Sequence, residues 1–231
     1  MVDYGSAVKR PFTNWKNFLI GFVLSIIPIV NWIAKGYIVT NAGVGKKVDT
    51  KKLPDFKNWG DLFVKGFLAW LIGVIYMVPA GIFMMIGAGA IIGTLIGGAV
   101  GPFGGLIGEQ QGAEFAQLFS QQWPLIVPKL ITFAPILIVA VLLGIVAAFL
   151  TPVAILNFVK KSKFGDAFAF SDITKKAFTG DYFIVWLVTL VISVIIMWIL
   201  NYIPVVGSGL GMFITGVFAY TAIGEVFNKL K

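Results

Sequence analysis

The side chains of this sequence that could do chemistry are few, and their spacing does not build a catalytic site. Histidine and cysteine are absent, which removes the commonest general base, the thiol nucleophile and the thiolate metal ligand. Glu109 and Glu114 lie in a region without basic residues, but residues five apart lie on different faces of a helix. We find no nucleophile beside a base and no metal-ligand spacing, so we predict no catalytic residue, metal or cofactor.

Glycine is the residue type whose spacing is most informative. Glycines recur at every fourth position within 66–108, a run without ionisable side chains, at Gly89, Gly93, Gly97, Gly101 and Gly105. Positions four apart lie on one face of a helix, where glycine lets the backbone of another helix approach closely. Because Pro102 breaks the helix after Gly101, we predict a helix-packing and oligomer contact formed by Gly89, Gly93, Gly97 and Gly101.

Composition places these glycines in a membrane. The 231 residues are 58% hydrophobic and only 12% charged, and the mean hydropathy is +0.94. Four runs without charge cover 17–34, 66–108, 130–159 and 182–224. Each is near or beyond the roughly 20 apolar residues that cross a bilayer. We therefore predict an all-α, polytopic helical membrane protein with a single membrane domain over 1–231.

Basic residues flank the hydrophobic runs and set the expected topology. The net charge is +8, and 87–128 contains no Lys or Arg. If basic segments stay inside, both termini and both basic loops are cytoplasmic, in a multi-pass protein of the cell membrane. The basic residues border apolar runs instead of lining one polar face, so we expect anionic lipid headgroups as partners and no nucleic acid.

The first uncharged run favours an incomplete crossing. With basic segments before and after it on the same side, the chain must enter and leave on that side, and Pro28 supplies a break. We expect a re-entrant or interfacial helix pair over 12–45 and four full crossings in the rest of the chain. A second break at Pro204 lies between the last two crossings.

A topology with six crossings is the alternative. A single helix over 66–108 would be about 65 Å long, whereas the hydrocarbon core is about 30 Å thick. A break at Pro79 would let the glycine-rich segment cross by itself, which leaves open whether 86–108 spans the membrane. That topology violates the charge bias on at least one basic loop.

Two polar stretches are predicted to form amphipathic helices. The segment 62–123 would contain a span, the glycine-rich segment and a helix over 109–123 whose glutamines face water or line a polar vestibule, namely Gln110, Gln111, Gln117 and Gln121. The segment 124–231 would hold three spans and a basic amphipathic loop over 164–178. In that loop, Asp172 and Lys176 have the spacing of a helical ion pair.

Several motifs resemble a family of prokaryotic polytopic membrane proteins catalogued as domain of unknown function 4013. The main one, ahead of the second uncharged run, is Pro54-Asp55-Phe56-Lys57-Asn58-Trp59-Gly60-Asp61-Leu62-Phe63-Val64-Lys65-Gly66; further ones are Ile75-Tyr76-Met77-Val78-Pro79, Phe164-Gly165-Asp166-Ala167-Phe168, Asp181-Tyr182 and Ile203-Pro204-Val205-Val206-Gly207. The resemblance implies a polytopic membrane protein and brings no catalytic residue.

These patterns lead to one functional hypothesis and two alternatives. The first is a non-enzymatic, glycine-packed homo-oligomer that could enclose a pore. The second is a carrier for a small solute, because Ile-Pro breaks are repeated at Pro28 and Pro204 and broken helices often line transport sites. The third is a lipid-organising accessory subunit, which the basic loops favour.

Overall fold

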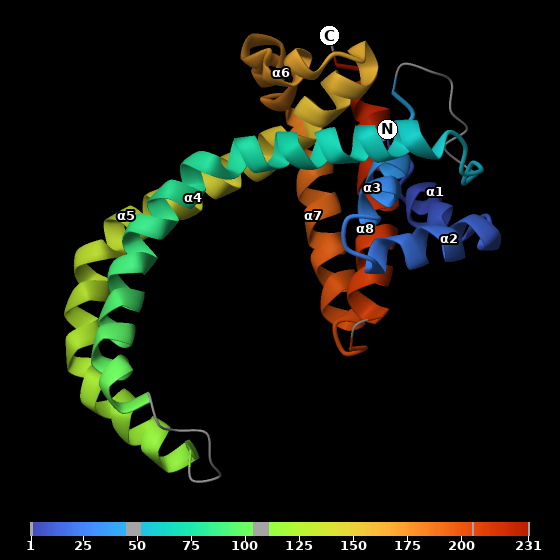
Figure 1. The fold of residues 1–231 in the computed structure, drawn as a ribbon. Coiled ribbons are helices and arrows are strands. Elements are labelled where there is room, and N and C mark those ends of the chain that lie inside the picture. Colours follow the sequence, from blue (N-terminus) through green and yellow to red (C-terminus); the bar gives the residue numbers. More distant parts are fainter. Residues whose placement is uncertain (1, 45–51, 104–110, 205, 231) are drawn as a thin grey trace. The chain divides into compact units, whose positions relative to one another are not determined.

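The computed structural model describes residues 2–44, 52–103, 111–204 and 206–230, and within these it leaves the side chains of 90–103, 111–123 and 125 undescribed. The regular elements of this part of the chain are all helical (Figure 1): α1 (Tyr4–Lys9), η1 (Arg10–Phe12), α2 (Trp15–Ile26), α3 (Asn31–Thr40), α4 (Trp59–Phe103), α5 (Gln111–Lys161), η2 (Phe164–Phe168), α6 (Phe170–Ala177), α7 (Gly180–Leu200) and α8 (Val206–Phe227).

The chain forms two compact units. One unit consists of Met1–Ile75 together with Ala148–Lys231, and the other consists of Tyr76–Ala147. The long helices α4 and α5 contribute residues to both units. We describe each unit by itself.

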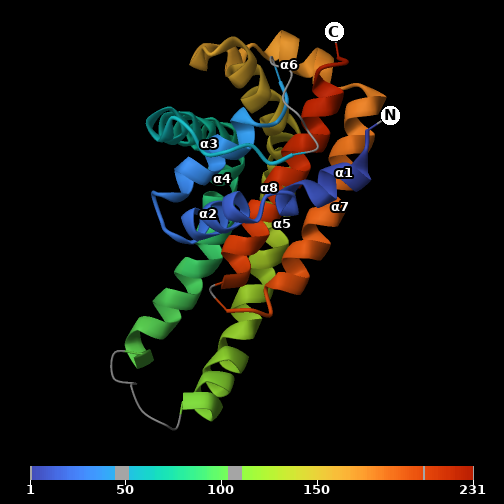
Figure 2. The same cartoon turned by 90° about the vertical axis from the view of Figure 1, so that its right-hand side faces the viewer.

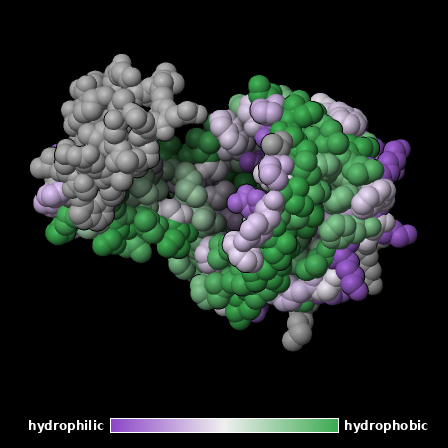
Figure 3. All heavy atoms as spheres, turned by 90° about the horizontal axis from the view of Figure 1, so that it is seen from below, coloured by the Kyte–Doolittle hydropathy of each residue, from purple (hydrophilic) through white to green (hydrophobic). Residues whose placement is uncertain are grey.

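Four helices in the described part of the chain are long and apolar enough to cross a membrane: Trp59–Gly89, Ile126–Lys161, Gly180–Leu200 and Val206–Phe227. Many of their large apolar side chains point outward, among them Met85, which is 76% exposed. Figure 3 accordingly shows hydrophobic residues over most of the coloured surface. The predicted all-α, polytopic fold with four full crossings is confirmed.

Helices α2 and α3 form a hairpin packed on α8 (Figure 2). They contain 12 and 10 residues, so each is about 15 to 18 Å long and too short to cross a bilayer. Helix α2 begins at an N-cap, Asn14, whose side chain accepts the Asn17 N–H. Pro28 lies in the turn between the two helices, where Ile29 has a left-handed backbone with φ of 68°.

Close contacts give the position of this hairpin along α8. Ile26, the last residue of α2, lies so near Gly209 that an added methyl group there would overlap its side chain. On the other arm, the carbonyl of Ala42 lies against Gly224, close to the C-terminal end of α8. The turn of the hairpin therefore points toward the N-terminal end of α8, and its second arm returns toward the opposite end.

In the second unit, the parts of α4 and α5 that lie within Tyr76–Ala147 run side by side (Figures 1 and 2). An added methyl group at Gly87 would lie 2.6 Å from the Leu137 side chain, and one at Gly144 would lie 3.9 Å from the Ala80 side chain. The two helices therefore approach closely at Gly87 and make ordinary van der Waals contact at Gly144.

Three sequence-based expectations about helix boundaries are wrong. Pro79 does not break a helix, because α4 continues on both sides of it, so the six-crossing alternative has no turn at this position. The expected separate helix over 109–123 is instead, from Gln111 onward, the first part of α5. The expected helix over 164–178 is divided into η2 and α6 at Ala169, whose backbone is not helical.

Candidate functional site

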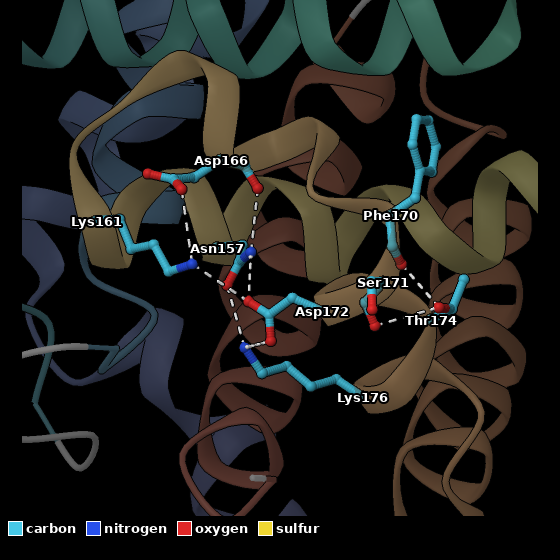
Figure 4. A network of polar contacts seen from close by, with 8 residues as sticks. All are labelled: Asn157, Lys161, Asp166, Phe170, Ser171, Asp172, Thr174 and Lys176. Carbon is cyan, nitrogen blue, oxygen red and sulfur yellow. Dashed lines mark hydrogen bonds and ion pairs between the residues drawn. The ribbon is translucent and has the colours of Figure 1, made fainter.

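The first concentration of polar side chains lies where α5 meets α6 (Figure 4). We call it the α5–α6 polar network, and it consists of Asn157, Lys161, Asp166, Asp172 and Lys176. Lys176 Nζ lies 2.9 Å from one Asp172 oxygen, and Lys161 Nζ lies 3.3 Å from the other. Lys161 also pairs with Asp166 at 3.6 Å. The predicted helical pair between Asp172 and Lys176 is thus confirmed.

Asn157 ties this network to the end of α5. Its side-chain amide donates to the Asp166 backbone carbonyl and to Asp172, both at 3.0 Å, and its oxygen accepts a hydrogen bond from Lys176 at 3.2 Å. Asn157 thus joins α5 both to η2 and to α6. A buried amide needs such partners, since leaving it without them is costly.

The electrostatics of the network follow from these contacts. The hydrogen bond from Lys176, helped by those from Asn157 and Lys161, lowers the pKa of Asp172 to about 2. Lys176 Nζ also lies 4.9 Å from the centre of the buried Phe227 ring of α8. Each of these charges has a partner, so the arrangement joins helices and offers no free nucleophile or base.

A second group of polar contacts surrounds Arg10, a residue that is only 1% exposed. One guanidinium nitrogen donates to the Asn41 carbonyl at 2.8 Å and to the Thr221 hydroxyl at 2.7 Å. Another nitrogen donates to the Lys52 carbonyl at 3.3 Å. Arg10 therefore fastens the N-terminal segment to α8 and to the chain that follows α3. Sequence reasoning missed this role, because Arg10 looks like any other basic residue beside a hydrophobic run.

Asn17, on α2, attaches this helix to the segment that precedes α4. Its buried amide donates to the Pro54 carbonyl at 3.0 Å and to Asp55 Oδ1 at 2.9 Å. The hydroxyl of Tyr37 donates to the same carbonyl. Both arms of the hairpin thus bind the segment that leads into α4, and side chains supply the hydrogen-bond partners of its Pro54 carbonyl.

The predicted glycine contact falls only partly within the described side chains. Gly89 is exposed, and an added methyl group there would meet no described atom within 4 Å. Gly93, Gly97 and Gly101 lie in α4, so the four glycines share one helix as predicted. The surroundings of those three lie outside the described residues, and the packing contact stays a prediction.

The four glutamines predicted to line a vestibule lie in the first part of α5 or directly before it in the sequence. Gln111, Gln117 and Gln121 belong to α5, with surroundings outside the described residues, and Gln110 itself lies outside them. A vestibule formed by the four glutamines therefore stays a prediction.

The two remaining prolines lie between packed helices. Pro28 lies between α2 and α3, and Pro204 lies between α7 and α8. A surface hollow is lined by Trp198, Asn201 and Tyr202, and neither proline is among these residues.

These features define the class of the protein as a polytopic, helical integral membrane protein. Residues 20–205 match the family described as "Protein of unknown function (DUF4013)", and the chain belongs to that family. No curated protein and no solved structure matches the chain. The family match over residues 20–205 confirms the resemblance inferred from the sequence motifs.

Proposed function

We propose that the protein is a non-enzymatic component of the cell membrane that assembles with copies of itself through one face of α4. The interacting face would consist of Gly89, Gly93, Gly97 and Gly101. Such an assembly could enclose a pore between its subunits, which conductance across a reconstituted bilayer would measure.

The observation that carries this proposal is a contrast between glycines. Gly36 and Gly66 lie where α3 and α4 cross within one chain, and an added methyl group at either would overlap a backbone carbonyl of the other helix. Gly89 has no such neighbour among the described residues. Gly89 is exposed and begins a series of four glycines at four-residue spacing, which leaves the helix backbone accessible to a helix of another subunit, and small residues are enriched at such contacts.

The test is the particle mass of the double variant Gly93→Leu, Gly97→Leu in mild detergent. Leucine would separate the backbones, so we expect the oligomer to dissociate and the mass to fall to that of one chain plus detergent. Gly81→Leu is the matched control, since Gly81 is also an exposed glycine of α4 but does not belong to the series Gly89, Gly93, Gly97 and Gly101. An unchanged mass for the double variant would refute assembly through this face.

A second candidate function, the organisation of anionic lipid, is favoured by the lysines around the α5–α6 polar network. Lys160, Lys163 and Lys175 are exposed, and the described residues give none of them a carboxylate partner. Exposed lysines beside membrane spans attract anionic headgroups. Replacing Lys163 and Lys175 by Gln should lower the number of phosphatidylglycerol molecules that copurify, with a smaller difference at high salt. Equal numbers at low salt would argue against it.

The carrier hypothesis loses the observation that motivated it. Its repeated Ile-Pro breaks were expected to border a cavity, but Pro28 and Pro204 lie in turns between helices. We therefore retain assembly as the principal proposal.

A further inference from the structure

The hairpin brings one lysine to a depth that its place in the sequence does not suggest. Lys35 follows the uncharged run 17–34 and is the single charged residue within 17–45, so in the sequence it looks like a residue at the edge of a run. In the structure it lies in the middle of α3 (Asn31–Thr40) and is half-buried.

The contacts of Tyr37 and Ile38 show which part of α8 lies beside Lys35. The ring of Tyr37 stacks 6.3 Å from that of Phe213, and the side chain of Ile38 lies against Gly216. Phe213 and Gly216 are in the middle of α8, which spans Val206–Phe227. At 1.5 Å per residue, they lie about 10 to 15 Å from one end of that helix and about 16 to 21 Å from the other.

The direction of Lys35 follows from its neighbours on α3. Trp32 faces α4, where its ring packs 4.8 Å from that of Phe67, whereas Ile38 faces α8. By helical spacing, Lys35 lies on the edge of α3 between these two contacts, and Asn31 lies one turn earlier on the same edge. Both side chains are partly open to the surroundings, and neither has a hydrogen bond or ion pair among the described residues.

A lysine at this depth without a carboxylate is costly, because the hydrocarbon of the bilayer solvates a charge poorly. Ionisable side chains at membrane depth therefore commonly have a partner or a function. An ammonium group is a point charge with three donors and is a frequent phosphate ligand, and the Asn31 amide adds two donors. The mutual spacing of four residues lets both groups reach one oxyanion.

We propose that Asn31 and Lys35 form a binding site for a phosphate group on the α2–α3 hairpin, taken either from a phospholipid headgroup or from a small soluble phosphate. This site is separate from the α4 glycine face and from the exposed lysines near α6. Its failure would therefore leave both proposals above untouched.

Native mass spectrometry of the detergent-solubilised protein tests the site. The probes are phosphatidylglycerol, phosphatidylcholine and inorganic phosphate. For a lipid ligand, we expect tight binding of phosphatidylglycerol to fall about tenfold in Lys35→Gln, as for the loss of a charged hydrogen bond, and to persist in Lys35→Arg. For a soluble ligand, inorganic phosphate should raise the melting temperature of the wild type and not that of Lys35→Gln. The variant Lys16→Gln, which changes an exposed lysine of α2 outside the proposed site, should leave either signal unchanged.

A second variant covers the case in which Lys35→Gln does not fold. Asn31→Asp places a carboxylate four residues before Lys35, which would neutralise the ammonium group and compete with phosphate. We expect it to remove phosphate binding while the subunit count in the same spectrum stays that of the wild type. If Lys35→Gln or Asn31→Asp binds phosphatidylglycerol and inorganic phosphate as the wild type does, the site does not exist.

Discussion

At the scale of the residue, two ion pairs with the same helical spacing differ in their surroundings. The lysine of the Asp172–Lys176 pair has a side chain only 7% exposed, and its carboxylate is 35% exposed. In the Asp61–Lys65 pair the corresponding values are 27% and 50%. Exposed pairs contribute about 0 to 1 kcal/mol, whereas a buried lysine that loses its carboxylate is costly.

The variants Asp172→Asn and Asp61→Asn compare these surroundings directly. We expect Asp172→Asn to lower the free energy of unfolding by about 1 to 2 kcal/mol, because Lys176 keeps its charge in a buried position. Asp61→Asn should change it by less than about 0.5 kcal/mol. Titration with denaturing detergent in mixed micelles measures both values. Equal losses would show that burial of Lys176 does not control the energy of the pair.

The lowered pKa of Asp172 also predicts a pH dependence. Its pKa is about 2 in the folded protein against an ordinary value of 3.8. The carboxylate therefore stabilises the folded state above pH 4, and this contribution is lost as the pH falls from about 4 to about 2. The melting temperatures of wild type and Asp172→Asn should converge over this interval. A constant difference between them down to pH 2 would contradict the assignment.

At the scale of the element, helices α3 and α4 cross with their backbones in close approach. An added methyl group at Gly66 would overlap the Trp32 carbonyl, and one at Gly36 would overlap the Leu62 carbonyl. Farther along α4, a methyl group at Gly73 would lie 3.9 Å from Thr151, which is ordinary contact. The crossing therefore depends on one glycine of each helix, Gly36 of α3 and Gly66 of α4, and not on the glycine content of α4.

Two alanine substitutions on α4 should consequently have different effects on the stability of the folded protein. Gly66→Ala should destabilise the protein by about 2 kcal/mol, because the new side chain meets backbone of α3 and the helices must separate. Gly73→Ala should be neutral or stabilising by up to about 1 kcal/mol, since alanine favours the helix. Thermal unfolding in detergent measures both. A destabilising Gly73→Ala, or a tolerated Gly66→Ala, would contradict this account of the crossing.

Much of the element pattern could be predicted from the sequence, because apolar length is sufficient to recognise a span. The four spans and the helix break at Pro28 are visible as uncharged runs and a proline. The continuity of α4 through Pro79 could not be predicted, because a proline in a long helix can be accommodated by local adjustment of the backbone. Sequence spacing likewise gave the Asp172–Lys176 pair but not the role of Arg10, whose partners lie far away along the chain.

At the scale of the whole molecule, the first and last segments of the chain meet. The Asp3 backbone N–H donates to Glu225 at 3.2 Å, and Arg10 binds Thr221 of the same helix, α8. The α5–α6 polar network also contacts the end of α8, at Phe227. The N-terminal segment and the α5–α6 polar network therefore contact the same end of α8. A cytoplasmic location of both termini stays a prediction from the distribution of basic residues.

Single cysteine variants test that topology, because the sequence contains no cysteine. We expect Ser6→Cys and Ser162→Cys to react with a membrane-impermeant maleimide only after the cytoplasmic side is opened. Asn201→Cys, in the turn between α7 and α8, should react in intact cells. Reaction of Ser162→Cys and Asn201→Cys from the same side would exclude a complete crossing by α7.

The packing of the α2–α3 hairpin on α8 has a consequence for how the protein is inserted into the membrane. A ribosome synthesises α2 and α3 before α4 to α7, yet the surface against which they pack belongs to α8, which follows all of these helices in the chain. Until that helix emerges, the hairpin lacks its contacts at Gly209, Gly216 and Gly224. The insertion machinery or the surrounding lipid must therefore accommodate the hairpin while α4 to α7 are synthesised, and its native contacts form only after α8 has emerged.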